Sequence, residues 1–137
     1  MRVFKFGGAS VKDAAGIKNV YDVLQKVGYE DVLLVVSAMG KTTNALEIVI
    51  KNYFDKSAEL NSSVQEVKKY HNQILMDLFE DDKNEVFAAV NTQFADLEYF
   101  LTHNKSPNYN FVYDQIVSYG ELISTTILSH FMNFMGI

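Results

Sequence analysis

The chain has 137 residues, of which 48% are hydrophobic and 13% aromatic; this is enough for one globular domain with a packed core and excludes a disordered chain. A formal net charge of −5 without a Lys/Arg cluster argues against nucleic acid or an anionic membrane as the main partner. The lack of cysteine excludes a disulfide framework and a thiolate zinc site, and no apolar stretch approaches the roughly 20 residues of a membrane helix. We therefore expect a soluble, cytoplasmic protein.

The first ten residues, MRVFKFGGAS, predict a strand that ends abruptly at two glycines. The two-residue period of a strand places Lys5 on the same face as Val3. A glycine pair lets the backbone turn sharply and exposes N–H groups that attract phosphate, and a neighbouring lysine adds a positive charge. The alternative is a lysine that extends from an edge strand beside an ordinary strand-to-helix turn.

A helix follows, because apolar residues recur at spacings of three and four. Ser10 or Asp13 can cap its start and Gly28 can end it. The periodic residues are Ile17, Val20, Leu24 and Val27.

A second strand is predicted at residues 32–36, where the continuous run VLLVV indicates burial on both faces and a parallel β-α-β unit. The polar loop SAMGKTTN, residues 37–44, follows it, and a helix over about 45–54 starts behind Thr43 or Asn44. Ligands of open α/β sheets bind beyond the carboxyl ends of the strands. Residues 5–10 and 37–44 should therefore lie side by side.

The middle of the chain predicts two amphipathic helices packed as an antiparallel hairpin. We interpret His71 as a core or rim residue rather than a metal ligand, because no second ligand stands four residues later. The acidic turn at residues 80–82 is interpreted as a solvated connection. The apolar stripes consist of Leu60, Val64, Val67, His71, Ile74 and Leu78, and of Phe87, Val90, Phe94, Leu97 and Leu101.

The last predicted element is a long helix over about 111–134, which is apolar nearly all round and should be buried on most sides. From Gln115 to Ile137 the only formal charge is Glu121. A buried carboxylate must be paired, for instance with Lys41, or be hydrogen-bonded or functional. The adjacent Gly120 lowers helix stability by about 1 kcal/mol relative to alanine, which suggests a close approach of backbone or ligand.

Three segments resemble the N-terminal signatures of aspartate kinases, and the resemblance spans essentially the whole chain. They are KFGGAS at residues 5–10, VVSAMGKTTN at 35–44 and SYGELIST at 118–125. The resemblance implies an α/β protein with the amino acid kinase (carbamate kinase-like) fold, of which this is the N-terminal portion with a helical hairpin insert. It implies transfer of the ATP γ-phosphoryl group, with Mg²⁺, to the side-chain carboxylate of L-aspartate.

The resemblance also assigns roles to individual residues. Lys5 resembles the family's catalytic, phosphate-bridging lysine. The phosphate-binding turn is carried by Phe6, Gly7, Gly8 and Ser10. The residues that resemble the substrate-binding ones are Ser37, Thr43 and Glu121, and Glu121 would pair with the α-ammonium of aspartate.

Two strands make a poor core for a parallel sheet, so we interpret residues 1–137 as a partial, aspartate-binding lobe without the nucleotide-holding half or regulatory domains. We expect this lobe alone to be inactive and to self-associate through its open sheet edge or through the exposed apolar face of residues 111–134, and we expect the protein to be a homo-oligomer. Two alternatives stay open: a kinase of the same superfamily acting on acetylglutamate, glutamate or a nucleotide, and a non-catalytic assembly module.

Overall fold

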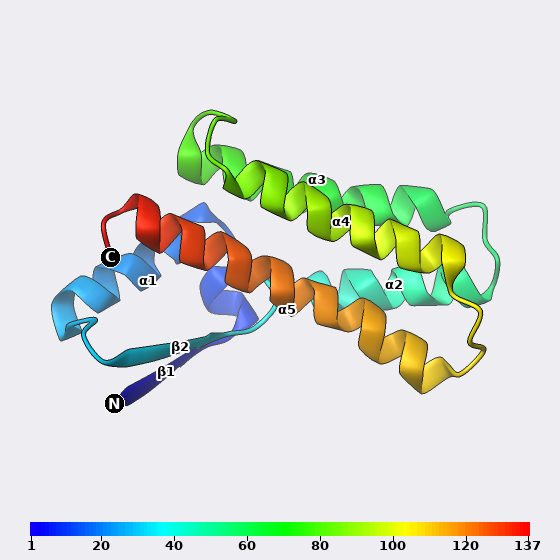
Figure 1. Ribbon diagram of the computed structural model, residues 1–137, viewed down its shortest axis with the longest axis horizontal. Coiled ribbons are helices and arrows are strands. Elements are labelled where there is room, and N and C mark those ends of the chain that lie inside the picture. The colour runs from blue at the N-terminus through cyan, green and yellow to red at the C-terminus, as the bar shows by residue number, and fades with distance from the viewer.

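The computed structural model describes residues 1–137 and combines a two-stranded sheet with five α-helices (Figure 1). None of the helices is long and apolar enough to cross a membrane. In chain order the elements are β1 (Arg2–Phe6), the 3₁₀ helix η1 (Gly8–Val11), α1 (Ala14–Val27), β2 (Val32–Val36), α2 (Thr42–Phe54), α3 (Leu60–Phe79), α4 (Val86–His103) and α5 (Tyr109–Phe134).

The parallel β-α-β unit predicted from the sequence is confirmed. β1 and β2 pair in parallel, with Lys5 opposite Val35. Of the two predicted caps, Asp13 is the one used, because its side chain accepts a hydrogen bond of 2.8 Å from the Gly16 amide. Gly28 ends α1 at a φ of 85°, a backbone conformation that glycine adopts without strain.

One face of the sheet is open, so the prediction that residues 32–36 are buried on both faces is wrong. Leu33 and Val35 are 50% and 42% exposed, and Val3 of β1 is 60% exposed. The opposite face, which includes Leu34, packs against the core, where α1 and α5 both lie. These two helices cover the same side of the sheet, and no element of the chain covers the other.

The antiparallel helical hairpin is also confirmed. α3 and α4 run side by side, with α3 packed chiefly on α2 and α4 on α5, and α2 also packs on α5, so that the four helices form an elongated bundle beside the sheet (Figure 1). His71 is completely buried in this bundle, as expected of a core histidine. The acidic turn is exposed, and Glu80 ends α3 in the left-handed conformation with a φ of 66°.

Two helices differ from their predicted form. α2 begins at Thr42, three residues earlier than predicted, with Lys41 at the N-cap position and no side-chain cap, so neither Thr43 nor Asn44 caps it. α5 buries one stripe rather than most of its circumference, since Phe111, Leu122 and others remain about half exposed. An apolar helix with few charges does not show which of its sides has a partner.

Candidate active site

The site is built from the two loops that follow the strands. We call residues 7–13 the first loop and residues 37–41 the second loop. The Ser37 amide donates a hydrogen bond of 3.0 Å to the Phe6 carbonyl, and the Gly40 amide donates one of 3.0 Å to the Gly8 carbonyl. A Cβ atom at Gly8 would lie 2.8 Å from the carbonyl oxygens of Ala38 and Gly40, so only glycine fits there. The predicted juxtaposition of the two strand ends is therefore confirmed.

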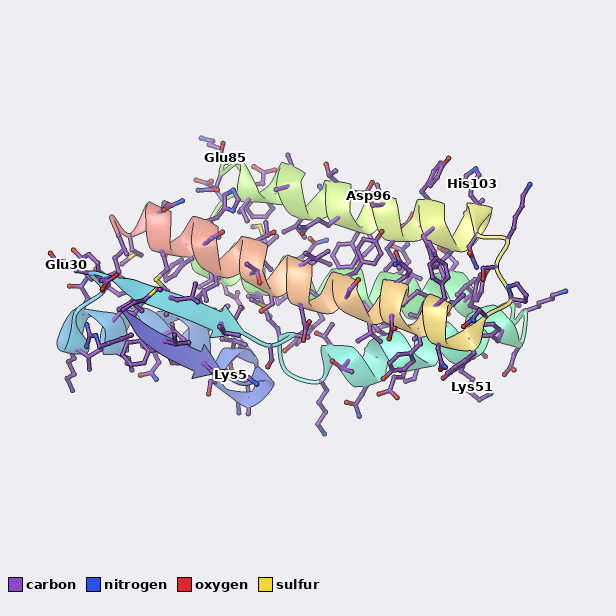
Figure 2. The ribbon with its side chains drawn as sticks, turned by 60° about the horizontal axis from the view of Figure 1, so that its bottom comes forward. Lys5, Glu30, Lys51, Glu85, Asp96 and His103 are labelled. Atoms are coloured by element: carbon purple, nitrogen blue, oxygen red, sulfur yellow. The ribbon has the colours of Figure 1, made fainter.

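Lys5 lies on the open face of the sheet, one residue before β1 ends. Figure 2 shows it beside η1, and its side chain takes part in none of the four ion pairs of the structure. A free ammonium group at a strand end is available to an anionic ligand. Lys5 therefore lies at the carboxyl end of β1, as predicted from the sequence.

The remaining residues of the predicted phosphate turn occupy the start of the first loop. Phe6 is half-buried and packs against the core, which anchors the end of β1. Gly7 stands at the N-cap of η1 and its carbonyl accepts a hydrogen bond of 3.0 Å from the Ser10 amide. The Ser10 side chain is exposed and has no hydrogen-bond partner, so it is free to bind a ligand.

The second loop leads directly into α2. Gly40 has a φ of 55°, and the Thr42 hydroxyl donates a hydrogen bond of 2.5 Å to the Met39 carbonyl. The backbone amides of Thr43 and Asn44 in the first turn of α2 have no acceptor in the chain. Such free amides at a helix N-terminus attract negative charge.

Glu121 is exposed on α5, so the prediction of a buried carboxylate is wrong. It forms no ion pair with Lys41 or any other cation. The buried stripe of α5 runs through its neighbours Gly120 and Ile123, and Glu121 stands at the edge of that stripe.

Gly120 makes the close approach that the sequence suggested, and the contact is with protein. A Cβ atom at Gly120 would lie 3.1 Å from the Ala38 Cβ and 3.2 Å from the Leu46 Cδ1 and Thr42 Cγ2 atoms. α5 therefore rests directly on the second loop and the start of α2, and it carries Glu121 to the same region.

Ser124 is a site residue that sequence reasoning missed. Its side chain is completely buried, and its hydroxyl donates a hydrogen bond of 2.7 Å to the carbonyl of Ser37. This bond ties α5 to the end of β2 and fixes Ser37, whose own side chain was the predicted ligand. The signal was the spacing, because Ser124 stands four residues after Gly120 and hence on the same face of the helix.

A groove of about 590 Å³ adjoins both loops, where α3 faces them. Its polar lining comes from Lys12, Asp13, Lys41, Glu66 and Tyr70. Burial raises the pKa of Tyr70, and the Asp13 carboxylate raises it further, so the hydroxyl stays protonated at neutral pH.

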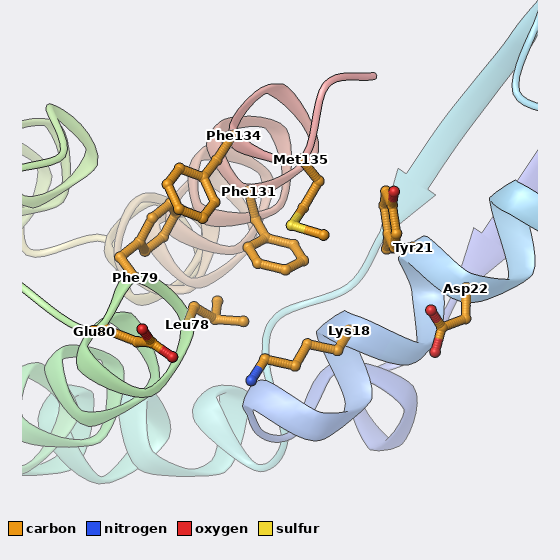
Figure 3. A pocket seen from close by; sticks show the side chains of 9 residues that line it. All are labelled: Lys18, Tyr21, Asp22, Leu78, Phe79, Glu80, Phe131, Phe134 and Met135. Carbon is orange, nitrogen blue, oxygen red and sulfur yellow. The ribbon is translucent and has the colours of Figure 1, made fainter.

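A separate cavity of about 400 Å³ lies between α1 and the ends of α3 and α5 (Figure 3). Aromatic rings of Phe79, Phe131 and Phe134 form much of its wall, with Lys18 and Glu80 at its edge. No residue of either loop lines it. It is therefore not part of the candidate site.

Phosphoryl transfer is the chemistry that this arrangement suits. The reaction needs cations and N–H donors around the moving phosphoryl group, and it needs positioning more than covalent chemistry. Lys5 offers the cation, and the loops and the start of α2 offer amides and hydroxyls.

Comparison with known proteins agrees with this interpretation. The model of the amino acid kinase family matches residues 1–137. The chain is 30% identical over 141 aligned residues to aspartokinase 1, chloroplastic, of Arabidopsis thaliana, covering 98% of this chain and 24% of that protein. It is 26% identical to the bifunctional aspartokinase/homoserine dehydrogenase 2 of Escherichia coli K12, and this match covers 99% of this chain and 16% of that protein.

Two solved structures of E. coli aspartokinase III share the fold. The complex with lysine and aspartate (T-state) has a TM-score of 0.80 at 22% identity, covering 100% of this chain and 30% of that one. The complex with aspartate and ADP (R-state) has a TM-score of 0.74 at 22% identity, covering 97% and 29%. This chain spans at most 24% of the length of the curated relatives that it matches. The chain belongs to the amino acid kinase family.

Proposed function

We propose that residues 1–137 form the aspartate-binding N-terminal lobe of an aspartate kinase. The whole enzyme transfers the γ-phosphoryl group of ATP to the side-chain carboxylate of L-aspartate and gives 4-phospho-L-aspartate. The observation that carries this proposal is the pair of loops bonded together at the carboxyl ends of two parallel strands, beside an unpaired lysine. The similarity to proteins named aspartokinases supports the choice of substrate.

In this proposal the first loop holds the phosphates. Lys5 bridges phosphate oxygens and stabilises the charge that develops as the phosphoryl group moves. The turn made by Phe6, Gly7 and Gly8 lets the backbone approach the phosphates closely, and the free hydroxyl of Ser10 donates to them.

The second loop and α5 hold the amino acid. Ser37 and Thr43 offer hydroxyls at the end of β2 and in the first turn of α2. Glu121 pairs with the α-ammonium group of aspartate, which gives this carboxylate the partner that it lacks within the chain.

ATP is the proposed co-substrate, and the neighbouring structure with ADP supports a nucleotide. Mg²⁺ would arrive with the nucleotide, since this ion usually takes most of its protein-site ligands from phosphates and water.

The remaining proposals concern the whole protein. We propose a homo-oligomer, because the open sheet face exposes apolar side chains that need cover. The nucleotide-holding half and regulatory domains are proposed to lie outside residues 1–137. A cytoplasmic location is proposed from the composition, although several similar proteins are named chloroplastic.

The test is ATP turnover by the full-length protein with L-aspartate, compared with acetylglutamate and glutamate. Turnover with aspartate alone is the expected result. Turnover with another acceptor would favour a different kinase of the family, which the family-wide match also fits. No acceptor-dependent turnover, together with a stable assembly in light scattering, would favour the assembly module.

A further inference from the structure

The hairpin helix α3 touches both loops of the candidate site through one residue, Tyr70. The Tyr70 hydroxyl donates a hydrogen bond to the backbone carbonyl of Lys12, 58 residues away, in the first loop. The same hydroxyl occupies the position that a Cβ atom at Gly40 in the second loop would need. Tyr70 therefore lies where the first loop, the second loop and α3 meet.

The next residue of α3 fixes this turn of the helix. His71 is completely buried, and its Nδ1 atom lies 2.8 Å from the Val67 carbonyl, so Nδ1 carries the hydrogen. Its Nε2 atom lies 3.4 Å from the Thr42 hydroxyl, at the start of α2. The imidazole also packs against the ring of Phe94 on α4, with 5.7 Å between centroids. Tyr70 thus stands on a turn whose buried His71 contacts the first residue of α2, directly after the second loop.

Few backbone hydrogen bonds join the first loop directly to the second loop. The Gly40–Gly8 hydrogen bond is the backbone bond that joins the two loops beyond the strand ends. Gly40 is held at a φ of 55°, and the nearest atoms to the side on which a Cβ would stand belong to Tyr70 and Lys12. Removing the Tyr70 hydroxyl takes away the atom nearest to that side of Gly40 and this hydrogen-bond donor to the Lys12 carbonyl.

We propose that Tyr70 is a positioning residue that holds the first and second loops at a fixed separation, so that the hairpin sets the geometry between the phosphate and amino acid halves of the site. The kinetic part of this inference rests on the proposed function. Tyr70 itself touches no reacting group. It acts through Lys12 and Gly40, whose loops carry the residues proposed to bind ligands.

The variant that tests this is Tyr70→Phe in the full-length protein, because it removes the hydroxyl and keeps the ring. Tyr53→Phe is the matched control. The Tyr53 hydroxyl is also hydrogen-bonded across the fold, to Asn104 at 2.8 Å, near the end of α2 that is remote from the loops. Both variants lose one hydroxyl and its hydrogen bonds, so a general loss of stability should appear in both.

The first measurement is hydrogen exchange at the amides of Gly40 and Thr42, which bond to the Gly8 and Met39 carbonyls. Loss of one hydrogen bond of about 1 kcal/mol corresponds to about five-fold faster exchange in Tyr70→Phe and no change in Tyr53→Phe. The second measurement is steady-state kinetics, in which kcat/KM for aspartate should fall about five-fold in Tyr70→Phe only.

The outcomes separate this inference from the proposed function. If the wild-type protein turns over aspartate and Tyr70→Phe matches Tyr53→Phe in both measurements, the positioning role is refuted and the function stands. If the wild-type protein lacks aspartate-dependent turnover, the proposed function fails, and hydrogen exchange alone decides whether Tyr70 holds the loops. Unchanged exchange at Gly40 and Thr42 overturns the inference in either case.

Discussion

Replacing Gly120 by alanine probes the contact between α5 and the second loop. Alanine is favoured over glycine inside a helix by about 1 kcal/mol, so the substitution would stabilise an unobstructed position. At Gly120 the new methyl group would meet three atoms at once, at 3.1 to 3.2 Å. The end of Leu46 can turn away, whereas the Ala38 Cβ moves only with its backbone. Overpacking of this kind costs about 1–3 kcal/mol.

The net expectation for Gly120→Ala is a loss of about 1 kcal/mol in the free energy of unfolding, since the overpacking cost exceeds the helix gain. Urea unfolding followed by circular dichroism measures this change. Ser118→Ala serves as the control, because Ser118 is exposed on the same helix and its hydroxyl bonds to the Gln115 carbonyl of that helix, not to another element. If Gly120→Ala instead stabilises the protein by about 1 kcal/mol, the packing of α5 on the second loop is looser than the structure indicates.

Four further predictions concern three titratable side chains and the activity of residues 1–137 on their own. Lys5→Ala in the full-length protein should lower kcat by orders of magnitude with little effect on unfolding, because the side chain is exposed; an unchanged kcat contradicts the catalytic role. Glu121→Gln should raise the KM for aspartate more than the KM for ATP. If the variant and the wild-type protein have the same KM for aspartate, Glu121 is not part of the substrate site. Burial lowers the pKa of His71 below its ordinary value of 6.5, so as the pH falls the unfolded chain takes up a proton at this histidine before the folded chain does. The stability that His71 contributes is therefore complete above pH 6.5 and is lost below it. The urea midpoint should fall less on acidification in His71→Gln than in the wild-type protein. Residues 1–137 alone should show no aspartate-dependent ATP turnover above blank and should elute as a dimer or larger species in size-exclusion chromatography with light scattering; turnover, or a clean monomer at high concentration, contradicts this.

Local signals in the sequence were enough to predict most elements. The spacing of apolar residues was enough to place both strands and the helix between them. The ends of that helix were predicted because Asp13 and Gly28 have the chemistry that helix ends require. The side-by-side loops followed from topology, because parallel strands end at the same edge of a sheet. The start of α2 was misplaced because α2 has no side-chain cap, and a helix without this signal cannot be located to the residue.

Tertiary contacts at the site were out of reach of pattern reasoning. The Tyr70–Lys12 hydrogen bond and the Ser124–Ser37 hydrogen bond join residues 58 and 87 positions apart. Neither side chain interrupts the local periodicity of its helix; the spacing from Gly120 marks the face on which Ser124 lies, but nothing in the neighbouring sequence names the partner of either side chain. Such contacts depend on how helices cross, which composition and spacing do not specify.

The proposal that residues 1–137 form one lobe of a larger enzyme gives the two failed burial predictions one physical cause. Val35 opposite Lys5, Leu33 opposite Val3, and Leu122 beside Glu121 are exposed although their surroundings in the sequence are strongly apolar. In the proposed enzyme, structure outside residues 1–137, which span at most 24% of the curated relatives, would cover these apolar side chains. The exposed apolar residues flank the two proposed ligand-binding charges, which is where a closing half of an active site would exclude water. On this argument, covering structure in the full-length protein should bury Leu33, Val35 and Leu122 together with the bound substrate.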